Sequence, residues 1–114
     1  MSKQTDKYNF FQDVYEVVKL IPKGRVTSYG AIAKYLGAPN KSRQVGYAMH
    51  GAVSTMGVPA HRVVNRNGEL TGASHFPPER PMEALLQAEG VEVVNGRIQQ
   101  FKSIYWDPVI ELAL

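Results

Sequence analysis

The sequence predicts a mainly α fold with small β elements and a winged-helix-like helix-turn-helix. Three observations lead to this prediction: apolar residues recur at helical spacing near the N-terminus, two short helical segments flank a tight turn, and an Asn-Gly pair separates two apolar runs. At 114 residues the chain is long enough for one hydrophobic core, so we expect residues 1–114 to form a single domain.

The first helix is expected to pack one apolar face on the core. That face is formed by Phe10, Val14, Val18 and Ile21. Asn9, with Gln12 three residues later, is expected to cap the start of the helix, and Pro22 follows its end.

Two further helices are expected on either side of a short turn. Thr27 or Ser28 can cap the first of them, which ends at Gly37. Residues 38–41 form the turn, and Ser42 is expected to cap the second helix. Two short helices joined in this way are typical of a DNA-binding helix-turn-helix.

The second half of the chain is expected to contribute small β elements around one more helix. Residues 63–64 precede a polar turn and predict a strand, and residues 81–90 predict a helix with an apolar inner face. Asn95-Gly96 predicts a β-hairpin, because these two residues tolerate the positive φ of a tight hairpin turn. The apolar tail around Trp106 is expected to dock on the core.

The distribution of charge predicts a surface that binds polyanions. Between Val17 and Gly68 the chain contains eight Lys and Arg residues and no Asp or Glu, although its net charge is only +3. Solvated faces usually mix both signs, so this block favours nucleic-acid binding over a chance clustering of surface lysines.

Composition also limits where the protein works. No segment is apolar over the roughly 18 residues that a membrane-spanning helix needs, so no membrane partner is expected. The polar residues 1–7 do not resemble a secretion signal, and the chain has no cysteine for disulfides. We therefore expect a cytoplasmic protein, associated with the nucleoid if the source is bacterial.

The most specific motif is Pro59-Ala60-His61-Arg62-Val63-Val64. Together with Arg43, it resembles the active-site strip of the O6-alkylguanine-DNA alkyltransferases, in which a cysteine between that proline and that histidine takes the alkyl group from guanine. Here the cysteine position is Ala60, whose methyl group cannot attack. The sequence is therefore identified as similar to the alkyltransferase-like proteins, and the resemblance covers about residues 10–93, a DNA-binding domain of the C-terminal alkyltransferase type.

The resemblance implies DNA-binding roles for five residues. The second helix of the motif, starting near Ser42, would enter the minor groove, where Gly46 allows close approach. Arg43 would replace the extruded nucleotide in the stack, Tyr29 would help to turn its phosphate, and His50 would contact phosphate. Simpler interpretations stay open: a phosphate contact for Arg43, a half-buried packing role for Tyr29, and a helix C-cap for His50.

The resemblance also implies a lesion pocket without chemistry. Its lining would include Tyr29, Met49, Ala60, Val63, Thr71 and Gly72. His61 and Glu89 match the family's base and its orienting carboxylate, and without a nucleophile we expect this vestigial relay to be structural. Because alanine leaves free volume, the pocket is expected to accept O6 substituents larger than methyl.

Two departures from the family pattern concern the same site. Ala52 stands where the alkyltransferases have a hinge asparagine that supports the thiol network. Residues 71–76 replace the usual loop over the pocket, from which some alkyltransferase-like proteins probe the base with an arginine. An ungapped match puts Ala73 at that position, with Arg80 or His75 as alternative probes.

The favoured function is a non-enzymatic sensor of O6-alkylguanine in double-stranded DNA, which flips the lesion and marks it for nucleotide-excision repair. We expect a monomer with no cofactor and no metal. The alternative is a helix-turn-helix transcription regulator without lesion specificity, although neither long polar side chains on the recognition helix nor a dimer seam is evident. A third hypothesis is a cysteine-free enzyme that acts through His61 and water.

Overall fold

Three helices pack together in the first half of the chain: α1 (Asp6–Val18), α2 (Tyr29–Tyr35) and α3 (Ser42–Ala52). The computed structural model describes residues 6–53 and 57–113, with side chains from residue 10 onward. Residues 1–5 lie outside this part, and they make up most of the polar segment that we did not expect to be a secretion signal. None of the described helices is long and apolar enough to cross a membrane.

The predicted helices exist, but two of their starts differ from prediction. α1 begins at Asp6, so Asn9 lies inside the helix and is not its cap. Lys41 occupies the N-cap position of α3 without a capping hydrogen bond, and Ser42 is the first residue of the helix. A cap contributes only about 1 kcal/mol, so packing of the apolar face can move a helix start past it. Ser28 does cap α2, since its Oγ accepts a hydrogen bond from the Ala31 amide at 3.1 Å.

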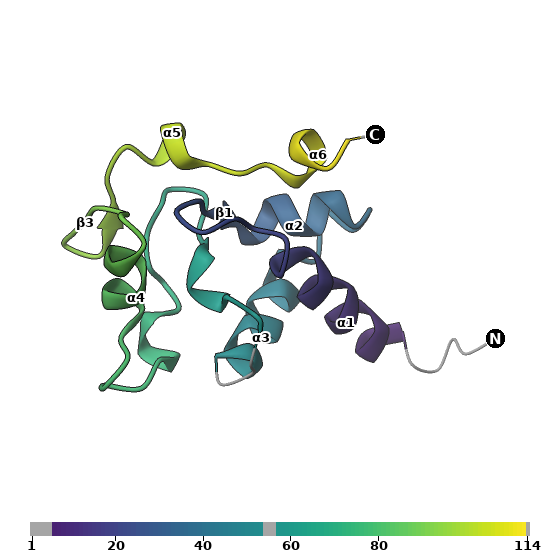
Figure 1. Cartoon of the computed structure of the whole chain (residues 1–114). Coiled ribbons are helices and arrows are strands. Elements are labelled where there is room, and N and C mark those ends of the chain that lie inside the picture. Colours follow the sequence, from purple (N-terminus) through teal and green to yellow (C-terminus); the bar gives the residue numbers. More distant parts are fainter. Residues whose placement is uncertain (1–5, 54–56, 114) are drawn as a thin grey trace.

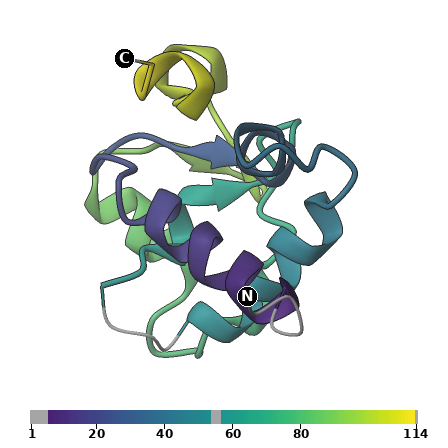
Figure 2. The same cartoon turned by 90° about the vertical axis from the view of Figure 1, so that its right-hand side faces the viewer.

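A parallel pair of two-residue strands lies between two hydrophobic cores. β1 (Thr27–Ser28) pairs with β2 (Val63–Val64) in the register Thr27 to Val63 and Ser28 to Val64. Figure 2 shows the two strands side by side, with α1 in front of them. Successive residues of a strand face opposite sides, so Val63 enters the helical core while Val64 enters the second core.

The second core is built from α4 (Met82–Ala88) and the hairpin of β3 (Val93–Val94) and β4 (Arg97–Ile98). Met82 and Leu86 are its buried helical residues, whereas Leu85 is half-buried. The predicted hairpin is confirmed, with Asn95 and Gly96 both at positive φ. Figure 1 shows this unit on the opposite side of the molecule from α1. The mainly α fold with small β elements is therefore confirmed.

The C-terminal segment docks across both cores (Figure 1). It contains α5 (Phe101–Ile104) and α6 (Pro108–Glu111). Hydrogen bonds from the Val26 amide to the Ile104 carbonyl and from the Trp106 amide to the Val26 carbonyl place it beside β1. Trp106 is buried in the helical core, as the docking prediction requires.

Replacing Trp106 with alanine should lower the free energy of unfolding by about 3–5 kcal/mol, because the change leaves a cavity in the helical core. Trp106 is 3% exposed, while Ile110 in the same tail is 70% exposed. Ile110→Ala should therefore change the free energy of unfolding by less than about 0.5 kcal/mol. Urea denaturation followed by circular dichroism measures both values. Equal effects of the two substitutions would contradict docking of the tail through Trp106.

Candidate nucleic-acid interface and base pocket

An open groove of about 330 Å³ runs along the exposed side of α3. It is lined by Tyr29, Ser42, Arg43, Gly46, Tyr47, His50 and Thr71. The structure thus brings together all five residues predicted to contact DNA. Tyr47 was missed as a site residue, although its position one helical turn after Arg43 places both on the same face.

Not all of the acid-free basic block belongs to this groove. Arg25 donates hydrogen bonds to the carbonyls of Ile104 and Tyr105, at 3.1 and 2.8 Å, and so ties the C-terminal segment to β1. Arg62 is turned towards Glu89 in the interior. The charge pattern predicted that these basic residues form one surface. Arg43 does lie in the groove, whereas Arg25 and Arg62 hold parts of the fold together.

Beside the groove lies a pocket that contains five of the six predicted lesion-pocket residues. Tyr29, Met49, Ala60, Val63 and Gly72 line it. The sixth, Thr71, lies in the outer groove, where its Oγ1 is 3.4 Å from the Tyr29 hydroxyl. Gly72 fits against Tyr29, since a Cβ at this position would be 3.2 Å from the Tyr29 hydroxyl oxygen.

The pocket is closed in this structure. Its cavity is about 10 Å³, no more than the roughly 10–15 Å³ that a cavity needs to hold a single water molecule. The expected free volume at Ala60 is therefore not available inside this pocket. His75, from the 3-10 helix η3 (Ala73–His75), stacks on His50 with ring centroids 3.6 Å apart. Both imidazoles line the pocket, and a flipped base can enter only if the pocket widens.

The structure shows where the three candidates for probing the base lie. His75 reaches the pocket, whereas Arg80 lines a different cavity and Ala73 is exposed.

Ala52 is fully buried in the helical core, where an alanine packs without a polar group that needs a partner. His50 lies before the end of α3, so its contact is with His75 and it does not occupy the C-cap.

Ala60 begins the 3-10 helix η2 (Ala60–Arg62) and is 4% exposed. The next two residues bind Glu89, the residue after α4. His61 Nε2 is 2.8 Å from a Glu89 carboxylate oxygen, and Arg62 donates to the same carboxylate at 2.7 Å. Arg62 also donates to the Ile21 carbonyl at 2.8 Å, so one cluster joins η2, α4 and the end of the α1 segment.

The charge of Glu89 is strongly favoured in this cluster. Burial of the carboxylate raises its pKa, but hydrogen bonds from Arg62, His61 and the Gly24 amide outweigh burial and lower the pKa to about 2. The predicted pairing of His61 with Glu89 is present, and Arg62 is the partner that sequence reasoning missed. Because Arg62 lies within the motif itself, its fork of donors was the available signal.

The free energy of unfolding should fall as the pH is lowered from about 5 to about 2. Glu89 has a pKa of about 2 in the folded chain against an ordinary 4.5, so its stabilisation is complete above the ordinary value and is lost as the pH falls. With Glu89 only 10% exposed, the loss is on the order of 3 kcal/mol. Acid-dependent urea denaturation measures it. Glu89→Gln should flatten the dependence of the free energy of unfolding on pH, whereas the exposed control Glu79→Gln should keep it. If Glu89→Gln kept the wild-type dependence, the proposed stabilisation by the Glu89 cluster would be contradicted.

The stacked imidazoles give a second pH prediction. Burial and the neighbouring charge of His75 lower the pKa of His50 below 6.5, so the neutral form is favoured in the stack. The stack is therefore most stable above pH 6.5 and weakens as acid protonates His50. NMR titration should show the pKa of His50 below 6.5 and should move it towards that value in His75→Ala. An unchanged titration in His75→Ala would argue against the stack.

Comparisons with known proteins agree with this geometry. The family described as 6-O-methylguanine DNA methyltransferase, DNA binding domain, matches residues 9–91. Alkyltransferase-like protein 1 of Schizosaccharomyces pombe is 38% identical over 93 residues, which cover 82% of this chain and 86% of that protein. A DNA base-flipping protein of Escherichia coli (strain K12) is 43% identical over 107 residues, covering 92% of this chain and 80% of that protein.

The fold comparison points the same way. The crystal structure of S. pombe Atl1 in complex with damaged DNA containing O6-carboxymethylguanine matches with a TM-score of 0.78 and 35% identity, covering 89% of this chain and 97% of that one. The resemblance to alkyltransferase-like proteins, predicted from the residues around Ala60, is thus confirmed. The chain belongs to the 6-O-methylguanine DNA methyltransferase DNA-binding domain family.

Proposed function

We propose that this protein is a non-enzymatic sensor that binds O6-alkylguanine in double-stranded DNA, flips the modified nucleotide into the pocket beside Ala60 and holds it unreacted. The observation that carries the proposal is that the groove along α3 and the base pocket lie next to each other. The groove with Arg43 adjoins a pocket whose lining includes Ala60, and Tyr29 and His50 line both. A nucleotide displaced at the groove would therefore meet the pocket directly.

The relatives support lesion binding and flipping. The S. pombe protein is named alkyltransferase-like and is seen with damaged DNA, and the E. coli protein is named for base flipping. Because the chain shares their family, the same handling of DNA is the simplest use of its groove and pocket.

The exposed side of α3 suits the minor groove. Gly46 gives this side no side chain at the point nearest Tyr29, so the backbone can approach DNA closely. The minor groove of B-DNA is only about 6 Å wide and offers few base-specific contacts, which favours small residues over long polar ones. Arg43 is exposed in the first turn of α3, where it can enter the stack after a nucleotide leaves.

The pocket holds the lesion without chemistry. Alkyl transfer needs a nucleophile at the reacting carbon, and Ala60 presents a methyl group there. No residue of the chain is a cysteine. His61 is held by Glu89, so its ring supports the loop and has no thiol to deprotonate. We infer that the alkyl group stays on guanine.

An unrepaired lesion must pass to another activity. A protein that marks O6-alkylguanine without removing the alkyl group leaves the adduct for other proteins to remove, and we propose that nucleotide-excision repair proteins take over the marked site. We also propose that the chain binds DNA as a monomer in the cytoplasm. The hand-over to repair proteins is supported by the family resemblance and by the absence of a nucleophile at residue 60.

Paired duplexes that differ only by O6-methylguanine in place of one guanine test the proposal. Fluorescence anisotropy at fixed salt should give at least about tenfold tighter binding to the lesion duplex, equal to about 1.4 kcal/mol. A transcription regulator would instead prefer one sequence regardless of the lesion, and an enzyme would accumulate a changed product. Equal affinity for both duplexes would contradict the proposed function.

Arg43→Ala should weaken binding to the lesion duplex by about 10- to 100-fold, because the gap left by the flipped nucleotide then costs a few kcal/mol of unfilled stacking. Lys102→Ala removes the same charge from α5, outside the groove lining, and should lower the affinity for both duplexes by well under tenfold. The decisive reading is the ratio of lesion to intact affinity. If Arg43→Ala kept the wild-type ratio, insertion of Arg43 would be ruled out.

A further inference from the structure

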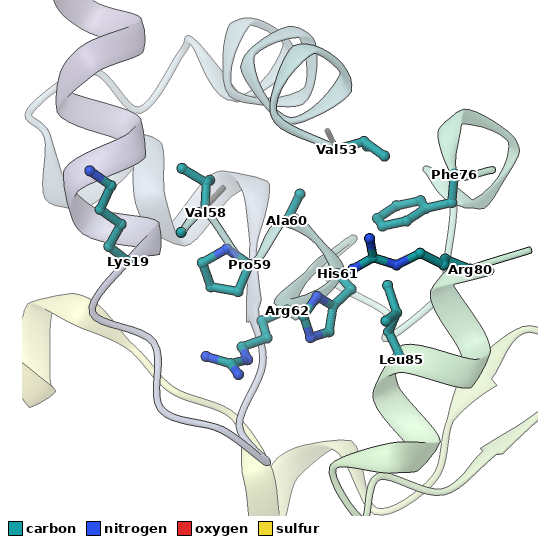
Figure 3. A pocket seen from close by; sticks show the side chains of 11 residues that line it. Lys19, Val53, Val58, Pro59, Ala60, His61, Arg62, Phe76, Arg80 and Leu85 are labelled. Carbon is teal, nitrogen blue, oxygen red and sulfur yellow. The ribbon is translucent and has the colours of Figure 1, made fainter. Parts of the chain in front are cut away.

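A second and much larger cavity shares Ala60 with the base pocket. Figure 3 shows the side chains that line this second cavity. Its volume is about 530 Å³, against about 10 Å³ for the closed base pocket. Three residues, Val53, Ala60 and Phe76, line both cavities. These three residues therefore lie between the two cavities, and the side chain of Ala60 is a single methyl group.

The lining of this cavity is basic. Among the described residues, four basic side chains and no acidic one line it: Lys19, His61, Arg62 and Arg80. His61 and Arg62 are bound to Glu89, and Lys19 pairs with Glu16 at 3.5 Å, so these contacts neutralise part of the charge. Arg80 takes part in no ion pair within residues 6–53 and 57–113. Figure 3 shows its guanidinium extended beside Phe76 towards His61, so this charge is available to a ligand.

The remaining side chains of the lining are apolar, and they include Val53, Val58, Pro59, Phe76 and Leu85. An apolar wall that leads to an unpaired cation fits a guest with a hydrocarbon chain and an anionic end. The chain would gain from burial along the wall, and the anion would gain charge-assisted hydrogen bonds from the guanidinium. A guest without the anionic end would gain only from burial.

The position of Ala60 connects this cavity to the proposed lesion site. By the family resemblance, the O6 substituent of a flipped guanine points towards residue 60. His75 and Phe76 follow each other in the chain and both line the base pocket, and Phe76 also lines the second cavity. The side chain of Ala60 is a single methyl group, so no long side chain blocks the way there.

We propose that the two cavities act together, so that the base pocket holds guanine while the second cavity receives the distal end of long O6 substituents that end in a carboxylate. Ala60 is then the residue that lets the substituent pass, and Arg80 is the residue that selects the anionic end. This inference rests on the proposed function, because it needs a flipped O6-alkylguanine in the base pocket.

Four duplexes with matched sequence test the inference: intact guanine, O6-methylguanine, O6-(4-carboxybutyl)guanine and its uncharged isostere O6-(4-carbamoylbutyl)guanine. Wild-type protein should bind the carboxylate adduct about tenfold tighter than the carbamoyl adduct at low salt. Arg80→Gln should reduce this ratio to near one while keeping the wild-type affinity for O6-methylguanine. Arg80→Lys, which keeps the charge, should retain most of the ratio, and Arg97→Gln is the exposed control that should leave it unchanged.

Ala60→Leu tests the passage. The larger side chain should lower the affinity for the carboxybutyl adduct by a larger factor than that for O6-methylguanine. Equal losses for both adducts, or no preference of the wild-type protein for carboxylate over carbamoyl, would overturn the inference. If the preference for O6-methylguanine over intact DNA is kept, the proposed function survives that failure; if that preference is absent, the proposed function itself has failed.

Discussion

The parallel pairing of β1 with β2 is the contact on which the site depends. The pairing of Thr27 with Val63 sets the segment that enters α2 beside the segment that leaves η2. Tyr29 and Ala60, which are far apart in the sequence, consequently line one pocket. The Glu89 cluster holds the same loop from its other side, through His61 and Arg62. Two short strands and one carboxylate thus position the pocket against the helix-turn-helix.

His61 and Glu89 can serve catalysis or structure, depending on the side chain at position 60. A histidine paired with a glutamate beside a thiol would activate it, whereas beside the methyl group of Ala60 the pair stabilises a loop. The low pKa of Glu89 fits the second role, because a carboxylate that stays charged down to about pH 2 works as a fixed ion-pair partner. His50 stacks on His75 in the lining of the closed pocket, so a base that entered the pocket would have to replace a ring contact that is already present.

The sequence predicted the features that have local signals. A cap at Thr27 or Ser28, a hairpin turn at Asn95-Gly96 and the motif around Ala60 could all be predicted, because a few neighbouring residues determine each of them. The β1–β2 pairing was not, since two-residue strands show no periodicity and their pairing joins distant segments. The closed pocket was missed for the same reason: the stack of His50 on His75 depends on how η3 packs. The charge count could not show that Arg25 and Arg62 bind carbonyls and carboxylates of the fold itself.

The pocket is proposed to bind a modified base and to release it unchanged. The most direct measurement saturates the protein with duplex containing O6-methylguanine, then determines the intact mass of the protein and the nucleoside content of the recovered DNA. The protein mass should stay unchanged, and O6-methylguanine should be recovered completely after saturation. A protein heavier by one methyl group, or guanine found in place of the lesion, would contradict it.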